Sequence, residues 1–129
     1  MLVVIDTNIF VSAFINPEGI PAKIAWALSK GELQICYNIE ILDEYRQVLY
    51  RDKFRFDKTK LTYLLDSIIE DGFMVMPETI DINFIDETDR KFYEVAVTAN
   101  AKLITGNLKH YPKDGIAISP ADFLDKYNY

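Results

Sequence analysis

The sequence predicts a three-layer α/β/α sandwich whose central parallel sheet has about five strands. Three observations lead to this prediction: short apolar segments alternate with longer amphipathic ones, the apolar segments contain almost no polar residues, and polar residues directly follow several of them. Continuous apolar strands are typical of a sheet buried on both faces, and alternation with helices favours parallel pairing through right-handed crossovers. The chain has 129 residues and no internal repeat or linker, so we expect one domain spanning residues 1–129.

Five short apolar segments are expected to form the strands, because turn or helix-capping residues bound them. Their ranges are 2–5, 33–37, 73–76, 103–105 and 116–118. The single cysteine, Cys36, lies in the second of these segments. We expect it to be a small buried hydrophobe without a disulfide, as suits a reducing compartment.

Six helices are expected from apolar residues that recur at helical spacing. Pro21 in a first turn and Asn38 as an N-cap mark two helix starts, and Gly31 and Gly72 mark two helix ends. Ile69 is expected on the buried face of the fourth helix. The six helices are expected over 9–15, from Pro21 to Gly31, after Asn38, over about 57–71, up to Lys102, and after Ser119, which opens a capping box.

The charge balance limits the classes of partner. The chain carries 14 basic and 20 acidic residues, a net charge of −6, which argues against binding nucleic acid or anionic membranes through bulk charge. Contact with nucleic acid therefore has to be local or assisted by a metal ion. No apolar segment approaches the roughly 20 residues that span a bilayer, and Asp6 interrupts the first apolar run before it resembles a signal peptide. We expect a soluble cytoplasmic protein that does not bind membranes.

Four polar residues are placed where they can meet at the carboxyl edge of the sheet, which is where open parallel sheets bind ligands. Asp6 follows the first strand, Asn107 lies two residues past the fourth, and Asp89 lies in the first turn of a helix. Glu44 is on another helix, and the rotation of about 100° per residue puts it near the edge of the apolar face, whereas Asp43 points almost the opposite way. A buried carboxylate usually has a cation or hydrogen-bond donors as partners.

Each of these residues also has a simpler interpretation when it is taken alone. Glu44 can be a solvated acid at the boundary of its helix. Asp86 and Asp89 fall where acids cap helix N-termini, although Asp86 is also a candidate auxiliary metal ligand. The tripeptide Thr105-Gly106-Asn107 can be an ordinary turn.

Taken together, these segments resemble a PIN-domain ribonuclease over essentially the whole chain. The branch that the motifs resemble most is described as the VapC-like toxin components of toxin–antitoxin pairs. Many relatives in that branch have Asp where this chain has Asn107, which brings no charge, so a second metal position is expected to be weak. The motifs that carry the resemblance are Asp6-Thr7-Asn8, Ile-Leu-Asp-Glu-Tyr around Glu44, Asp-Arg-Lys-Phe-Tyr-Glu-Val-Ala from Asp89, and Thr105-Gly106-Asn107.

The resemblance implies a metal-dependent endoribonuclease that hydrolyses phosphodiester bonds in single-stranded or structured RNA. The implied catalytic residues are Asp6, Glu44, Asp89 and Asn107. The three carboxylates among them suit one or two Mg²⁺ or Mn²⁺ ions, which prefer oxygen ligands and bridge carboxylates to phosphates. A homodimer and a cognate antitoxin are further implications of the resemblance. The residues that would hold carboxylates or waters in place are Thr7, Asn8 and Thr105.

A basic stretch in this acidic chain is a candidate RNA contact. Residues 51–60 contain five basic and two acidic residues, and two phenylalanines interleave with Arg51, Lys53 and Arg55. Cations contact phosphates and aromatic rings stack on bases, so this composition fits a single-stranded nucleic acid. The alternative is a connection between helices whose phenylalanines pack into the core.

Three further polar residues are expected to have no catalytic role. His110 is the only histidine and is expected to be a solvated loop residue. Glu94 falls opposite the apolar face of its helix and is expected on the surface. Asp122 is best explained as the acid of a capping box.

Two other classes of function remain open from the sequence. A haloacid-dehalogenase-type phosphatase also begins with an acid after an apolar strand, here Asp6, but it uses a second acid two residues later, where this chain has Asn8. The other class is a non-catalytic PIN-like module that binds RNA or a partner protein. The neutral Asn107 and the net negative charge favour that second alternative.

Overall fold

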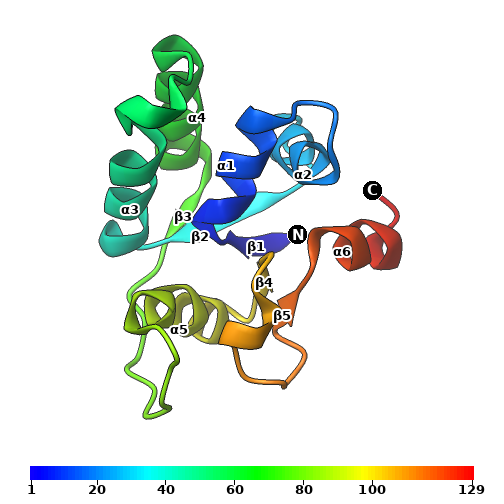
Figure 1. The fold of residues 1–129 in the computed structure, drawn as a ribbon. Coiled ribbons are helices and arrows are strands. Elements are labelled where there is room, and N and C mark those ends of the chain that lie inside the picture. The colour runs from blue at the N-terminus through cyan, green and yellow to red at the C-terminus, as the bar shows by residue number, and fades with distance from the viewer.

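Five parallel strands form one sheet in the order β3-β2-β1-β4-β5 in the computed structural model, which describes residues 1–129 (Figure 1). Every neighbouring pair is parallel, so the predicted α/β fold class is confirmed. Cys36 is buried in the sheet, as predicted. The strands are β1 (Leu2–Ile5), β2 (Gln34–Tyr37), β3 (Phe73–Met74), β4 (Lys102–Ile104) and β5 (Ala117–Ile118).

Strand β3 is shorter than the expected segment 73–76 because it lies at the edge of the sheet with only one neighbour. Phe73 and Met74 are 48% and 53% exposed. Val75 N donates one last hydrogen bond to Tyr37 O at 2.8 Å, after which the chain leaves the sheet. The apolar segment 73–76 therefore extends one residue beyond the last hydrogen bond to β2.

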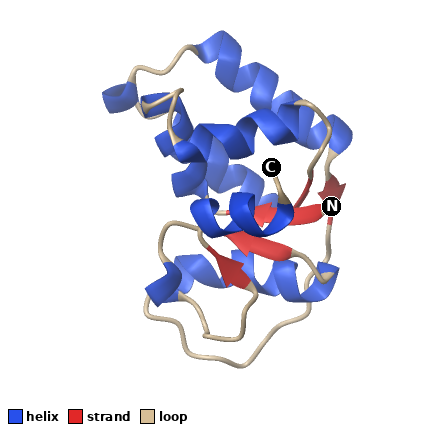
Figure 2. Cartoon of the chain, turned by 90° about the vertical axis from the view of Figure 1, so that its right-hand side faces the viewer, coloured by secondary structure: helices blue, strands red, loops and turns tan.

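Six α-helices and three short 3₁₀ helices surround the sheet. The α-helices are α1 (Thr7–Ile15), α2 (Ile20–Ser29), α3 (Ile39–Leu49), α4 (Lys58–Asp71), α5 (Arg90–Ala99) and α6 (Pro120–Tyr127), and the 3₁₀ helices are η1 (Asp52–Phe54), η2 (Glu87–Asp89) and η3 (Leu108–His110). Helix α5 packs against β1, β2 and β4, and it lies on the opposite side of the sheet from α1, α2 and the α3–α4 hairpin (Figures 1 and 2). None of the helices combines the length and the apolar character needed to cross a membrane.

A buried tyrosine ties α3 to the end of β1 within a core of 28 residues. Tyr45 is fully buried, donates from Oη to Ile5 O at 2.5 Å, and packs edge-on against Phe10 with ring centroids 5.1 Å apart. The ring centroids of Tyr45 and of Phe92 in α5 are 6.4 Å apart. Because a buried phenol needs a hydrogen-bond acceptor, this contact fixes the rotation of α3 and with it the direction in which Glu44 points.

Two capping residues begin helices where the sequence predicts them. Asn38 Oδ1 accepts a hydrogen bond from Ile41 N at 2.9 Å at the start of α3. Ser119 Oγ accepts one from Asp122 N at 3.1 Å at the start of α6. Each bond satisfies a backbone N–H that has no partner inside the helix.

Gly72 ends α4 as predicted, but for a different reason from the one that helix-ending glycines usually have. Its φ is −84°, which any residue adopts, so no left-handed turn requires a glycine here. A Cβ at this position would lie 2.4 Å from Ile68 O and 2.8 Å from Ile35 O. The close approach of α4 to β2 therefore requires a residue without a side chain.

Several details differ from the sequence prediction. Strand β4 spans Lys102–Ile104 rather than 103–105. Helix α1 begins at Thr7 rather than at residue 9, because the preceding residue has the extended backbone of an N-cap. Helix α5 ends before Lys102, because Asn100 adopts a left-handed conformation with φ of 53°. Ile69 is 42% exposed rather than buried, because it lies about 100° around α4 from the buried Ile68.

Candidate active site at the carboxyl edge of the sheet

The carboxyl ends of the neighbouring strands β1 and β4 carry three buried polar side chains. Asp6 and Thr7 follow β1 and Thr105 follows β4, and they are 4%, 3% and 0% exposed. Asp6 N donates to Ile104 O at 3.0 Å, so the pairing of the two strands continues to the site. Burying polar groups is costly unless they find partners, and the partners of Asp6 define this edge.

The carboxylate of Asp6 has neutral hydrogen-bond donors. Its Oδ2 accepts hydrogen bonds from Thr105 Oγ1 at 2.8 Å and from Tyr111 Oη at 3.1 Å. Burial raises the pKa of Asp6, the two hydroxyls partly offset this rise, and the negative charge of Asp89 adds to it. A buried carboxylate whose charge is stabilised only by neutral donors attracts a cation.

Asp89 is the second buried carboxylate, at the end of η2, and it is 8% exposed. Its Oδ2 lies 3.0 Å from Nδ1 of His110. Burial raises the pKa of Asp89, and the contact with His110 partly offsets the rise. The phenol of Tyr111 faces both carboxylates, and its pKa is strongly raised by burial and by the charges of Asp6 and Asp89. Asp6 and Asp89 therefore border the same hydroxyl group.

Glu44 turns from α3 towards α1 and α5. Its Oε2 accepts a hydrogen bond from Thr7 Oγ1, and its Oε1 lies 2.8 Å from Nζ of Lys91. The Glu44 side chain is 24% exposed, whereas that of Asp43 is 55% exposed. This difference agrees with the expected rotation of the helix.

The three acids thus lie at one edge, linked by shared partners rather than gathered into a cluster. Asp6 and Asp89 share Tyr111, and Glu44 is bound to the residue after Asp6 and to Lys91, two residues after Asp89. No three acidic, histidine or cysteine side chains lie close enough together to form a ready-made metal cluster. Each carboxylate instead already has donors from the protein.

The remaining sequence candidates have different surroundings. Asn8 is exposed, and its backbone N–H lies near enough to Asp6 to lower the pKa of that acid. Asn107 is partly buried, and its backbone N donates to Thr105 Oγ1 at 3.0 Å. Asp86 is exposed and caps η2, accepting hydrogen bonds from the backbone and the hydroxyl of Thr88 at 3.0 and 2.7 Å. A capping role therefore accounts for Asp86.

Two expectations about neighbouring residues are wrong. His110 is not a freely solvated loop residue, because η3 folds back and brings it into contact with Asp89. Glu94 is not on the open surface: its side chain is 13% exposed and accepts a hydrogen bond from Ile80 N at 2.8 Å. The segment between β3 and η2 covers this face of α5, which a helical wheel of α5 alone does not reveal.

Two residues of the site were not predicted from the sequence. Lys91 follows Asp89 by two positions and lies in the first turn of a helix, where acids are favoured over cations. A lysine at that position is the one sequence feature that could have indicated a nearby acid. Tyr111 gave no signal, because a tyrosine in an irregular loop has no periodicity. Its position depends on the path of η3 after β4.

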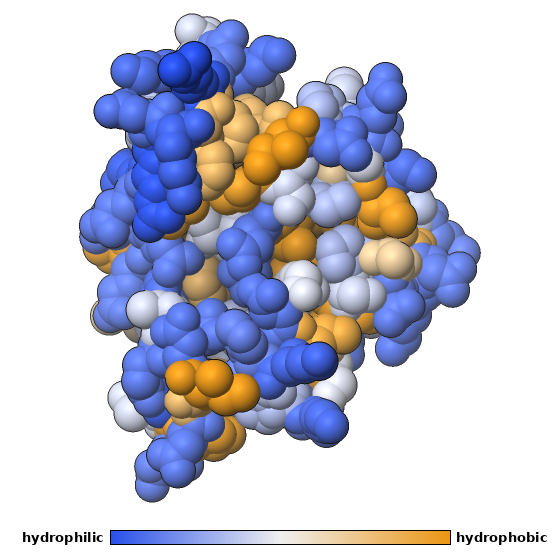
Figure 3. Space-filling view, viewed as in Figure 1, coloured by the Kyte–Doolittle hydropathy of each residue, from blue (hydrophilic) through white to orange (hydrophobic).

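The basic stretch 51–60 lies at the connection between α3 and α4, at the top of Figure 1. Its two phenylalanines stack on each other with ring centroids 5.0 Å apart, and Phe56 also contacts Phe14 of α1 at 5.2 Å. Figure 3 shows apolar surface beside this hairpin, within a largely hydrophilic face. The aromatic rings thus pack against the protein, as the alternative interpretation expected, while Arg51, Lys53 and Arg55 are exposed.

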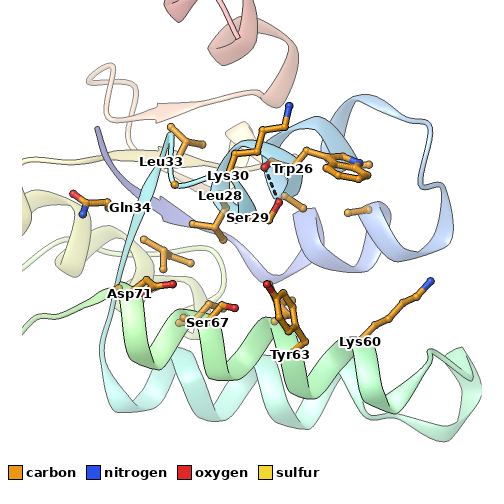
Figure 4. A pocket seen from close by; sticks show the side chains of 18 of the residues that line it. Trp26, Leu28, Ser29, Lys30, Leu33, Gln34, Lys60, Tyr63, Ser67 and Asp71 are labelled. Carbon is orange, nitrogen blue, oxygen red and sulfur yellow. Dashed lines mark hydrogen bonds between the residues drawn. The ribbon is translucent and has the colours of Figure 1, made fainter.

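An apolar groove between α2 and α4 is separate from the acidic edge. Trp26 and Tyr63 face it from opposite sides and are 61% and 69% exposed (Figure 4). Lys30 and Lys60 also line it, and none of the three acids does. The groove is therefore a second surface feature, distinct from the candidate active site.

The fold and its acidic edge define the class of α/β domains that carry a site at the carboxyl ends of parallel strands. Residues 2–109 match the PIN domain family, and the chain belongs to this family. PIN domains are generally nucleases, which are hydrolases of phosphodiester bonds.

Two similar proteins extend this comparison. The chain is 33% identical over 108 residues to an uncharacterized protein of Methanocaldococcus jannaschii, covering 81% of this chain and 70% of the relative. The fold of this chain is similar to that of a chain in the crystal structure of VapBC2 from Rickettsia felis bound to a DNA fragment from their promoter. The TM-score is 0.57 and the sequence identity is 19%. That similarity covers 92% of this chain and 98% of the other, and it supports the fold.

Proposed function

We propose that this protein is a metal-dependent endoribonuclease and the toxin of a toxin–antitoxin pair. The observation that carries the proposal is the placement of Asp6 and Asp89, two buried carboxylates with raised pKa values, around one tyrosine at the carboxyl edge of a PIN-domain sheet. Burying an acid without a cationic partner costs stability, and acids whose pKa is raised in this way mark candidate functional sites.

The donor set fits a hard divalent cation. Asp6, Asp89 and Glu44 offer carboxylate oxygens, and Asn107 offers a neutral amide oxygen, which suits one or two Mg²⁺ or Mn²⁺ ions. When bound, such an ion lowers the pKa of an attacking water and neutralises charge on the phosphate. The three carboxylates do not form a ready-made metal cluster in this structure.

The chain's own residues hold the carboxylates in place. Thr105 and Tyr111 orient Asp6 through its Oδ2. His110 orients Asp89 through Nδ1, and Thr7 orients Glu44. Hydrogen bonds of this kind restrict the rotamers of acids and tune the sites that the acids form.

We propose RNA as the substrate and the exposed cations Arg51, Lys53 and Arg55 as its additional contact. Because the net charge is −6, a local patch has to supply the attraction to phosphates that the whole surface lacks. The phenylalanines of this stretch serve packing, so the contact is proposed to be electrostatic.

We also propose a cognate antitoxin and a homodimer. The support for the antitoxin is the structural neighbour, in which VapBC2 is bound to a DNA fragment from the promoter. The homodimer is proposed from the family resemblance alone. The only tryptophan, Trp26, is exposed beside the apolar groove, so its fluorescence reports on partner binding at that surface. Co-purification with the product of an adjacent gene would test the pairing.

The alternatives are weaker on specific observations. A dehalogenase-type phosphatase needs an acid two residues after Asp6, and that position holds the exposed amide Asn8. A non-catalytic binding module would not need two buried acids whose pKa values are raised, as those of Asp6 and Asp89 are. Trapping of an aspartyl-phosphate on Asp6 would support the phosphatase, and RNA binding without cleavage would support the module.

Cleavage of a labelled single-stranded RNA in Mg²⁺ or Mn²⁺ tests the proposed function. We expect cleavage that EDTA abolishes and that Asp6→Asn and Asp89→Asn each reduce by at least about 100-fold, the order of effect typical of lost metal or catalytic contacts. The matched control is Asp43→Asn, because Asp43 is an exposed acid on α3 beside Glu44. Cleavage that persists in EDTA would contradict the proposal.

A further inference from the structure

One lysine reaches into the acidic edge and pairs with one of its three acids. Lys91 lies in the first turn of α5, and its Nζ is 2.8 Å from Oε1 of Glu44 in α3. The Lys91 side chain is 12% exposed. Its Nζ also donates to the carbonyl oxygen of Thr88. The ammonium group is therefore held at the site by two contacts rather than extended into solvent.

This contact leaves the three acids with unequal charge compensation. Both oxygens of Glu44 are occupied, Oε1 by Lys91 and Oε2 by Thr7. Asp6 and Asp89 form no salt bridge with a lysine or an arginine. Asp89 contacts the imidazole of His110, which carries a charge only when it is protonated. No permanently charged side chain therefore balances Asp6 and Asp89, and their two charges match one divalent ion.

We propose that Lys91 supplies the second positive charge of the site, so that the chain binds one divalent ion, through Asp6 and Asp89. Glu44 then acts as a positioning residue that holds the lysine. This inference rests on the proposed function and refines the number of ions, which that proposal leaves at one or two. A second ion beside Glu44 would meet the ammonium group at close range, where charge repulsion is poorly screened.

Calorimetric titration with Mn²⁺, without RNA, measures the number of ions directly. We expect the wild-type chain to bind one ion and the Lys91→Met chain to bind two, because Glu44 becomes free. Lys91→Arg keeps the charge and should still bind one ion. The matched control is Lys23→Met, since Lys23 is exposed on α2 and forms no salt bridge. Low-temperature electron paramagnetic resonance distinguishes single ions from coupled pairs.

A double variant separates the lysine's role from a direct role of Glu44. Glu44→Gln alone leaves the ammonium unpaired near the ion and should weaken Mn²⁺ binding by roughly tenfold. Glu44→Gln with Lys91→Met removes both charges and should restore one ion with an affinity near that of the wild type. If Lys91→Met alone does not fold, as judged by circular dichroism, this charge-balanced double variant carries the test.

The outcomes separate this inference from the proposed function. Two ions in the wild-type chain, or a Lys91→Met chain that binds one ion with unchanged affinity, would overturn the inference and leave a metal-dependent nuclease standing. A double variant that binds as weakly as Glu44→Gln would also overturn it, because Glu44 would then be a direct ligand. Absence of Mn²⁺ binding in every variant would overturn both proposals.

Discussion

Tyr111 Oη donates a hydrogen bond of 3.1 Å to Asp6 Oδ2, although the two residues are 105 positions apart in the chain. The bond joins the end of the first strand to the loop that contains η3. Because the same phenol faces Asp89, this loop positions both buried carboxylates. The candidate site therefore depends on a segment with little regular structure.

Tyr111→Phe is expected to destabilise the protein. The change leaves Asp6 Oδ2 with Thr105 as its remaining hydroxyl donor, and the loss of a hydrogen bond to a charged group costs about 1.5–3 kcal/mol. For a domain of this size we expect the melting temperature to fall by roughly 4 °C per kcal/mol. Thermal denaturation in EDTA measures this effect. Tyr63→Phe is the control, because Tyr63 is 69% exposed, and an equal loss in both variants would contradict the role of Tyr111.

The metal-free protein is expected to lose stability as the pH rises above the ordinary range of an aspartate. Folding raises the pKa of Asp6 from 3.8, so the folded chain binds a proton more readily than the unfolded chain does. Stability contributed by this group is present below pH 3.8 and is lost as the pH rises through the raised pKa.

Asp6→Asn should remove this contribution to the pH dependence, because the amide oxygen still accepts from Thr105 and Tyr111 but carries no charge. In EDTA at neutral pH we expect the variant to melt at a higher temperature than the wild type, while Mn²⁺ should stabilise only the wild type. Differential scanning fluorimetry from pH 4 to pH 8, in steps of about one unit, follows both effects. If the variant melts at a lower temperature than the wild type at every pH, the buried charge of Asp6 does not destabilise the metal-free protein.

Gly72→Ala should destabilise the fold by about 2 kcal/mol, within the range for a substitution that forces a close backbone contact. The added Cβ would lie 2.4 Å from Ile68 O, and backbone cannot move aside as a flexible side chain can. Gly106→Ala is the control, because nothing lies within 4 Å of a Cβ placed there. Urea denaturation of both variants measures the difference, and a neutral Gly72→Ala would show that α4 shifts freely from β2.

Lys53→Gln with Arg55→Gln tests the basic stretch as an RNA contact. Each lost phosphate contact should reduce the slope of log affinity against log salt by roughly 0.7 for a single strand. Binding is measured in Ca²⁺ or with Asp89→Asn, so that cleavage does not interfere. The control pair Lys23→Gln and Lys30→Gln, in α2 and at its C-cap, changes the net charge by the same amount. Equal slopes for the wild type and the Lys53/Arg55 variant would exclude the patch.

The sequence was sufficient for the architecture because its signals are local and mutually consistent. The apolar run at β1, the N-cap Asn38 and the N-cap Ser119 each act within a few residues. It was less reliable where the neighbouring element decides the outcome. Ile69 follows a helical apolar pattern but lies beyond the face that is covered, and Glu94 is covered by a loop that the helical pattern does not describe.

In the candidate site, too, the sequence predicts what depends on local signals and misses what depends on tertiary contacts. The order of the motifs indicated Asp6, Glu44 and Asp89, and helix rotation indicated the direction of Glu44. The partners of these acids could not be predicted, because Tyr111, His110 and Lys91 reach them through the tertiary path of η3 and the packing of α5 beside α3. The groups that balance the charges of the three acids come from different segments of the chain, so they become apparent only in the folded protein.

We propose that the buried acids at the end of β1 and just before α5 serve metal-dependent hydrolysis of RNA. The most direct measurement is the rate of single-stranded RNA cleavage as Mn²⁺ is titrated into EDTA-treated protein, with wild type, Asp6→Asn and Asp43→Asn compared. We predict cleavage that rises and saturates with Mn²⁺ in the wild type and in Asp43→Asn, and no cleavage above background in Asp6→Asn. Equal cleavage by all three proteins, or no cleavage by a wild-type protein that binds Mn²⁺ and RNA, would contradict the claim.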